Sequence, residues 1–156
     1  MKRIFVVVAL ATIVAATGMV GGGSALAHAR TKTFHIHDGT QTFVDRVPCI
    51  GGRATITLTF NAVFHRTRVA AHLFHVTETM TGTFVAVPLH AGRPTFTGHF
   101  TQWDGFNSNR QSATGTFTFS IHGVGSDGST VQFHEVAHFT MTKNGVVVNF
   151  DKAKCA

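Results

Sequence analysis

Residues 54–60 read ATITLTF, with an apolar side chain at every second position and threonine between them. Residues 116–121 read TFTFSI and alternate in the same way. A period of two is typical of a β-strand with one buried face, whereas an amphipathic helix needs a period near 3.6. Helical periodicity is not sustained after Arg30, so the alternation predicts an all-β fold.

Turn residues separate the alternating segments. Asn144-Gly145 is typical of a tight hairpin turn, and Asp127-Gly128 lies in a turn rich in Gly and Ser. The predicted strands are 33–37, 42–47, 54–60, 63–69, 72–87, 95–102, 113–123, 130–142 and 146–151. Since each strand has an apolar face to bury, we expect a single antiparallel up-and-down β-barrel of eight or nine strands, with a β-sandwich as the alternative. The whole chain has 15 Phe residues, and those on the inward faces would form either a packed core or the lining of a cavity.

The first 29 residues have the plan of a secretory signal peptide. Lys2 and Arg3 precede the apolar run 4–16, which is shorter than the roughly 20 residues that span a bilayer. Cleavage after Ala27 or Ala29 fits the small residues there. We therefore predict a signal peptide over 1–29 and a secreted, extracellular β-barrel domain over 30–156 without a membrane span.

Two cysteines, Cys49 and Cys155, stand near opposite ends of that domain. In an exported chain the compartment is oxidising, so the two thiols are expected to form a disulfide. The spacing shows no redox motif, and we interpret the bond as structural.

The charge of the predicted mature chain is mildly basic. Removing Lys2 and Arg3 from the 13 basic residues leaves 11, against 7 acidic residues, a net charge of 11 − 7 = +4 with histidine neutral. The basic residues are scattered along the chain, whereas nucleic-acid binders concentrate them in one run or face. We expect no nucleic-acid partner.

The sequence HEVAH at residues 134–138 matches the zinc-protease motif H-E-x-x-H. That motif functions on a helix, where both histidines lie on one side. In a strand, residues four apart are separated by about 13 Å, too far to share one zinc ion. His35 and His37 would lie on one side of a strand about 6.6 Å apart, but we interpret them as solvated. We predict no metal and no cofactor.

The two glutamates, Glu78 and Glu135, share strand parity with neighbouring apolar residues and are expected to point inward. Burial in an apolar interior raises the pKa of a carboxyl group toward values useful for acid–base chemistry. Two structural alternatives are that a β-bulge turns the glutamates outward, or that they are neutralised in a buried network by Arg66, Arg68 or Gln102. The functional alternative is that they form a polar spot in a cavity. The candidate ligand-binding residues are Glu78, Glu135, Gln102, Arg66 and Trp103.

The longest polar interruption of the alternation runs from Trp103 to Gln111. It is interpreted either as an ordinary surface loop or as a mobile loop at the mouth of the barrel, with Trp103 covering an opening.

Several segments together resemble a group of small exported bacterial proteins without an assigned activity. They are 47–49 (VPC), 81–84 (TGTF), 106–107 (FN), 125–129 (GSDGS) and 133–138 (FHEVAH). The resemblance implies a secreted β-barrel and brings no catalytic residues. In plan, a barrel with buried carboxylates is also similar to lipocalins and to allene oxide cyclase-like barrels.

Three classes of function follow from these observations. The first is a secreted barrel that binds a small apolar or amphipathic ligand, because Phe-rich inward faces, two inward carboxylates and a polar loop all fit it. The alternatives are a filled structural or interaction protein of the cell exterior, and a cyclase or isomerase that uses Glu78 or Glu135 as acid or base. The enzyme is the least favoured, and the oligomeric state stays open.

Overall fold

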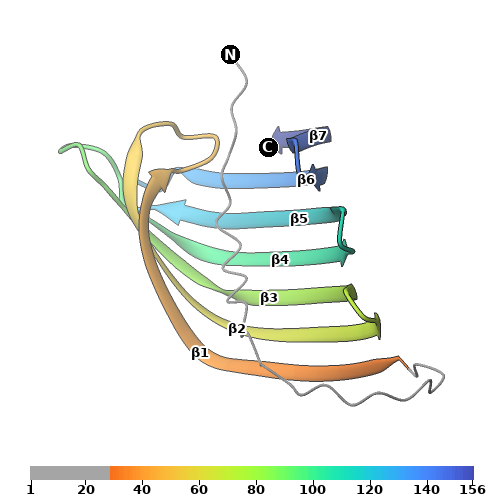
Figure 1. Ribbon diagram of the computed structural model, residues 1–156. Helices are drawn as coiled ribbons and strands as arrows, with labels where there is room; N and C mark the ends of the chain where they lie inside the picture. Colours follow the sequence, from red (N-terminus) through yellow and green to blue (C-terminus); the bar gives the residue numbers. More distant parts are fainter. Residues whose placement is uncertain (1–28) are drawn as a thin grey trace.

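The computed structural model describes residues 29–156, which form one antiparallel sheet (Figure 1). Its strands are β1 (Arg30–Arg46), β2 (Arg53–Ala70), β3 (Leu73–Pro88), β4 (Phe96–Ser108), β5 (Ser112–Gly125), β6 (Thr130–Thr142) and β7 (Gly145–Cys155). Each strand pairs with its neighbours in sequence, in the order β1-β2-β3-β4-β5-β6-β7. The all-β, up-and-down arrangement predicted from the alternation is confirmed. The predicted signal peptide lies almost wholly outside the described residues.

The number of strands was predicted wrongly, because two breaks in the pattern are not turns. Residues 33–37 and 42–47 belong to the single strand β1, which continues through a bulge between Ile36 and Gly39. Asp38 occupies the left-handed region there, with a φ of 51°. A bulge absorbs an extra residue without reversing the chain. Strand β2 likewise runs without interruption through Asn61 and Ala62.

The predicted closed barrel is not formed, and a sandwich is excluded because the described strands make one sheet. β1 and β7 are the two edges, and their backbones are not hydrogen-bonded to each other in residues 29–156. The sheet is nevertheless strongly curved (Figure 1). Neighbouring strands approach so closely that a Cβ at Gly82 would overlap the carbonyl oxygen of Thr59, and one at Gly98 that of His122. Glycine therefore permits the bend at these positions.

The sheet has an inner face, which carries Phe84, Phe100 and Phe133, and an outer face rich in threonine and histidine. The loop 47–52 folds over one end of the inner face, where Val47 and Ile50 pack against the buried core. We call this the covered end. The opposite end, at the β2–β3, β4–β5 and β6–β7 turns, is called the open end. The core lies at the covered end because, among residues 29–156, only there does a second segment exclude water from the sheet.

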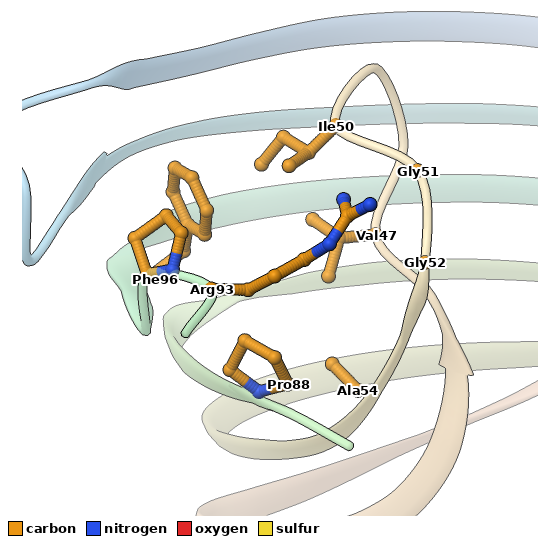
Figure 2. Close-up of a pocket in the computed structure, with 9 residues that line it drawn as sticks. Val47, Ile50, Gly51, Gly52, Ala54, Pro88, Arg93 and Phe96 are labelled. Carbon is orange, nitrogen blue, oxygen red and sulfur yellow. The ribbon is translucent and has the colours of Figure 1, made fainter. Parts of the chain in front are cut away.

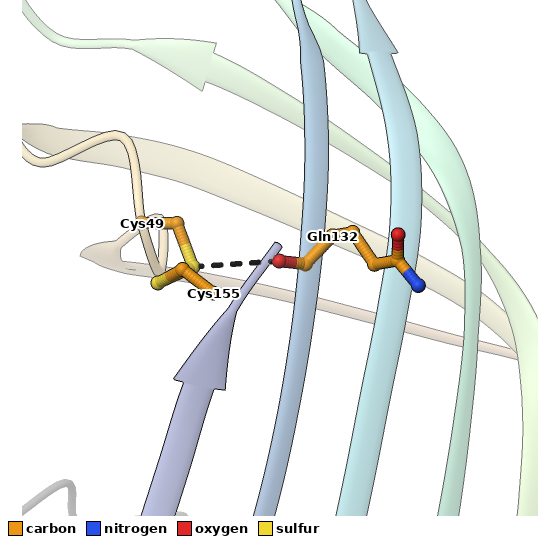
Figure 3. The surroundings of a disulfide bond; sticks show 3 residues. All are labelled: Cys49, Gln132 and Cys155. Atoms are coloured by element: carbon orange, nitrogen blue, oxygen red, sulfur yellow. Dashed lines mark hydrogen bonds between the residues drawn. A yellow bond between two sulfur atoms is a disulfide. The ribbon is translucent and has the colours of Figure 1, made fainter.

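The predicted disulfide between Cys49 and Cys155 is confirmed and fastens the covered end (Figure 3). It joins the loop after β1 to the last residue of β7, and the Cα atoms are 5.7 Å apart. The carbonyl oxygen of Gln132 lies 3.6 Å from Sγ of Cys49 and accepts a hydrogen bond of 3.1 Å from the backbone N–H of Ala156. The disulfide links the two edges of the sheet through the loop, although the edge strands β1 and β7 do not pair.

Candidate functional site

Two carboxylates meet near the middle of the inner face. Glu78 on β3 and Asp104 on β4 are register partners, so both side chains emerge on the same face from adjacent strands. The side-chain amide of Gln102 donates a hydrogen bond of 2.7 Å to Oδ2 of Asp104. One alternative drawn from the sequence was that Gln102 neutralises Glu78. Its side-chain amide instead donates to Asp104.

A second carboxylate pair lies across the face on β6 and β7. Glu135 is only 5% exposed. Among residues 29–156 it is the only charged residue that is buried. Its hydrogen-bonding neighbour is Asp151, which is exposed on the edge strand β7. Because two carboxylates repel each other, the negative charge of Asp151 favours the protonated form of Glu135. The inward orientation predicted for both glutamates holds, and no bulge turns either one outward.

The environment raises the pKa values of three of these acids, Glu78, Asp104 and Glu135. Desolvation, and secondarily the negative charge of Asp104, raises the pKa of Glu78 to about 7. Desolvation, followed by the charge and hydrogen bond of Asp151, raises the pKa of Glu135 to about 7. Burial also raises the pKa of Asp104, against the lowering effect of the hydrogen bond from Gln102. Both glutamates therefore exchange protons near neutral pH.

Phenylalanine rings occupy the inner face between the two carboxylate pairs. Phe117 and Phe119 on β5 are stacked, with centroids 6.0 Å apart, and are register partners of Asp104 and Gln102. Nearer the open end, the rings of Phe106 and Phe139 are 6.4 Å apart. The inner face thus combines aromatic surface with acids that can be neutral or charged.

A cluster of four cations lies on the inner face at the open end of β1 and β2. Arg30 is the register partner of Arg68, and Lys32 is the partner of Arg66. We call these four residues the cation block; all are exposed. The guanidinium of Arg66 lies 4.5 Å above the ring of Phe74. Sequence reasoning found Arg66 but missed the block, whose only sequence signal is the i, i+2 spacing of the basic residues on each strand.

Trp103 lies apart from the other candidate residues. It is on the outer face of β4, is 42% exposed, and its ring lies close to Gly105. The predicted polar loop from Trp103 to Gln111 was wrong, because β4 extends to Ser108 and only a short turn follows. That turn is held by the Asn109 side chain, which accepts hydrogen bonds from the backbone N–H groups of Gln111 and Ser112. Trp103 therefore cannot cover an opening of the inner face.

The pocket beneath the loop 47–52 is small (Figure 2). Val47 and Ile50 from the loop, together with Arg93 and Phe96, enclose a volume of about 40 Å³. Known ligand pockets measure about 300–1,000 Å³, so this space suits a water molecule or two rather than an organic ligand. A larger, shallow depression of about 420 Å³ lies on the outer face beside His99 and His122.

The histidines do not assemble a metal centre in the described part of the chain, where no group of three or more His, Cys, Asp or Glu side chains is placed to hold an ion. The HEVAH segment lies in strand β6, so its helical motif geometry is absent, as predicted. His134 and His138 instead share hydrogen bonds with Ser120 (2.7 Å) and Thr116 (2.9 Å). His35 and His37 are stacked with their centroids 6.1 Å apart.

Among residues 29–156 no helix has the length and apolar character needed to cross a membrane. The disulfide is compatible with an extracellular location. No protein-family model, curated protein sequence or solved structure matched the chain.

Proposed function

We propose that this is an exported protein that binds a small amphipathic molecule on the inner face of its sheet, toward the open end. The observation that carries the proposal is a row of apolar side chains that stay at least partly exposed there. The row crosses the sheet in register through Val76, Phe106, Phe139 and Val148, and we call it the apolar strip. Each of these side chains is partly or largely exposed.

A contiguous apolar strip flanked by charge is typical of a surface that another molecule covers. The strip lies between two kinds of polar group, the cation block at its β1–β2 end and the row of Glu78, Asp104 and Asp151 beside it. Such a site offers a hydrocarbon surface with several hydrogen-bonding partners, as small-molecule sites usually do. Because the space beneath the loop 47–52 is too small, we expect the ligand on the apolar strip.

The first test uses two neighbouring valines on β7 that point to opposite faces. Val148 belongs to the strip and is 54% exposed, whereas Val147 faces outward and is 57% exposed. Decanol is titrated into the protein, and binding is followed by NMR shifts of the backbone amides. Val148→Thr should weaken binding about threefold, because it places a hydroxyl against the chain. Val147→Thr is the matched control and should leave the affinity unchanged.

Two outcomes would contradict the proposal. Decanol that perturbs no amide of the inner face would show that the strip is not a binding surface. Equal effects of the two valine substitutions would place the binding elsewhere on the protein. Native mass spectrometry of protein purified from culture medium is the complementary measurement, because it reveals the mature N-terminus together with any retained organic molecule.

A cyclase or isomerase is the second candidate, and one observation favours it. A group that titrates near neutral pH can both take and give a proton at physiological pH, and the pKa of Glu78 is about 7. An isomerisation product has the same mass as its substrate. If the protein is such an enzyme, the wild type should carry the product and Glu78→Gln the unconverted substrate. The two bound molecules should then have the same mass but different chromatographic retention times. Identical molecules in both would rule out this role for Glu78.

A further inference from the structure

The strongest unexplained feature of the inner face is the cation block. Like charges placed directly opposite each other on neighbouring strands destabilise a sheet, and here two such pairs stand side by side. They hold four of the 11 basic residues that remain after Lys2 and Arg3 are left out. An anion bound between them would remove this repulsion and accept charge-assisted hydrogen bonds from the guanidinium groups.

We infer that the ligand of the inner face is an anionic single-chain amphiphile, whose phosphate or carboxylate head lies on the cation block and whose chain lies along the apolar strip. This inference rests on the proposed function and assigns the chemical class of its ligand. The register links the two parts directly, because Lys32, Arg66 and Val76 occupy one cross-strand row that continues into the strip.

The dimensions of the strip suit an extended hydrocarbon chain. Neighbouring strands lie about 4.8 Å apart, so the four steps from β3 to β7 span about 19 Å along the sheet. Gly115 on β5 lies between Phe106 and Phe139 and carries no side chain that would interrupt the strip. A Cβ at this position would overlap the ring of Phe139. The row therefore offers a continuous surface that is longer than an extended chain of ten carbons.

The exposure of the charged groups decides which end of the strip takes the head. The four cations are exposed at the rim, where a charged head keeps part of its hydration. Glu78, Asp104 and Glu135 lie further toward the core and are partly or fully buried, so a cationic head beside them would lose more of its hydration. Glu78 can lie near an anionic head because its pKa of about 7 leaves it partly protonated at neutral pH.

The test compares decyl phosphate, decanol, decyltrimethylammonium and inorganic phosphate on the full mature chain, below their micellar concentrations. Binding is measured by calorimetry and mapped by amide NMR shifts. Decyl phosphate should bind about tenfold more tightly than decanol, and the preference should shrink with added salt. The double variant Lys32→Gln/Arg66→Gln should lose this preference while still binding decanol. Arg46→Gln, an exposed arginine on the outer face of β1, is the matched control and should retain it.

The outcomes separate this inference from the proposed function. Equal affinities for decyl phosphate and decanol, or tighter binding of decyltrimethylammonium, would overturn the anionic ligand and leave the binding surface standing. Failure of every decyl compound would overturn both. Binding to anionic phospholipid vesicles without binding of monomeric decyl phosphate would also contradict the inference, because the surface would then recognise a membrane rather than a single chain.

Discussion

The covered and open ends of the inner face have the same alternating pattern but very different surroundings. At the covered end the loop 47–52 excludes water from Ala54, Phe96 and their neighbours, and the disulfide holds that loop in place. At the open end similar apolar residues, such as Phe106 and Val148, stay accessible. An alternating strand therefore creates an apolar face, whereas a second segment decides whether that face becomes a buried core.

The largest expected effect comes from removing the fastening of the covered end. The disulfide closes a loop with a sequence separation of 106 residues. In the chain-entropy model such a loop contributes about 4.7 kcal/mol to stability, as an upper figure. The double variant Cys49→Ala/Cys155→Ala should lose about 4 kcal/mol, measured by urea unfolding. An unchanged unfolding midpoint would show that the loop covers the core without the bond.

The two ends can be compared directly through one phenylalanine from each. Phe100 is 2% exposed at the covered end, so Phe100→Ala should destabilise the fold by about 3–4 kcal/mol. Phe106→Ala at the open end should lose about 1 kcal/mol, because its ring is already partly hydrated. Both variants are measured by urea unfolding under identical conditions. Equal losses would mean that the open end is covered in solution and would contradict the contrast drawn between the ends.

Glu135 makes the stability of the fold depend on pH. Its folded pKa of about 7 lies above the ordinary value of 4.5, so the folded protein binds the proton more tightly than the unfolded chain. This stabilisation is present below about pH 4.5 and is lost as the pH rises toward 7; it amounts to about 2–3 kcal/mol. In Glu135→Gln the decline between pH 5 and 8 should become smaller without vanishing, because the pKa of Glu78 is also raised to about 7. The melting temperature across that range is the measurement, and Asp45→Asn on β1 serves as the control.

If the decline persists in Glu135→Gln with its full amplitude, another group must cause it. Glu78, whose pKa is also about 7, is then the next residue to replace.

The smallest expected effect concerns the cation block. Lys32 lies opposite Arg66, so Lys32→Gln should raise stability by about 0.3 kcal/mol at low ionic strength. The gain should vanish in 0.5 M salt, where exposed charges are screened. Precise chemical unfolding at two salt concentrations measures the difference. A loss of stability at low salt would show that Lys32 has a favourable partner and would weaken the argument that an anion is needed there.

Some of the candidate site could be predicted because strand parity is local information. Glu78 and Glu135 were placed on the inner face from their spacing to apolar neighbours, and the structure places them there. Trp103 was misjudged because its polar neighbours suggested a loop, whereas polar residues of one parity also suit an exposed strand face. The cation block could not be found, since the register between β1 and β2 depends on a bulge at Asp38 that the sequence does not reveal.

The all-β class, the antiparallel order of neighbouring strands and the pairing of the only two cysteines follow from the sequence alone. These properties depend on alternation, on short connections and on the chemistry of two thiols, all of which act locally or leave a single choice. Three features are visible only in the folded chain: the sheet stays open, Asp104 and Asp151 accompany the two glutamates, and four cations meet at one rim. Those features depend on how far each strand is displaced and bent against its neighbour, which is a property of long-range packing.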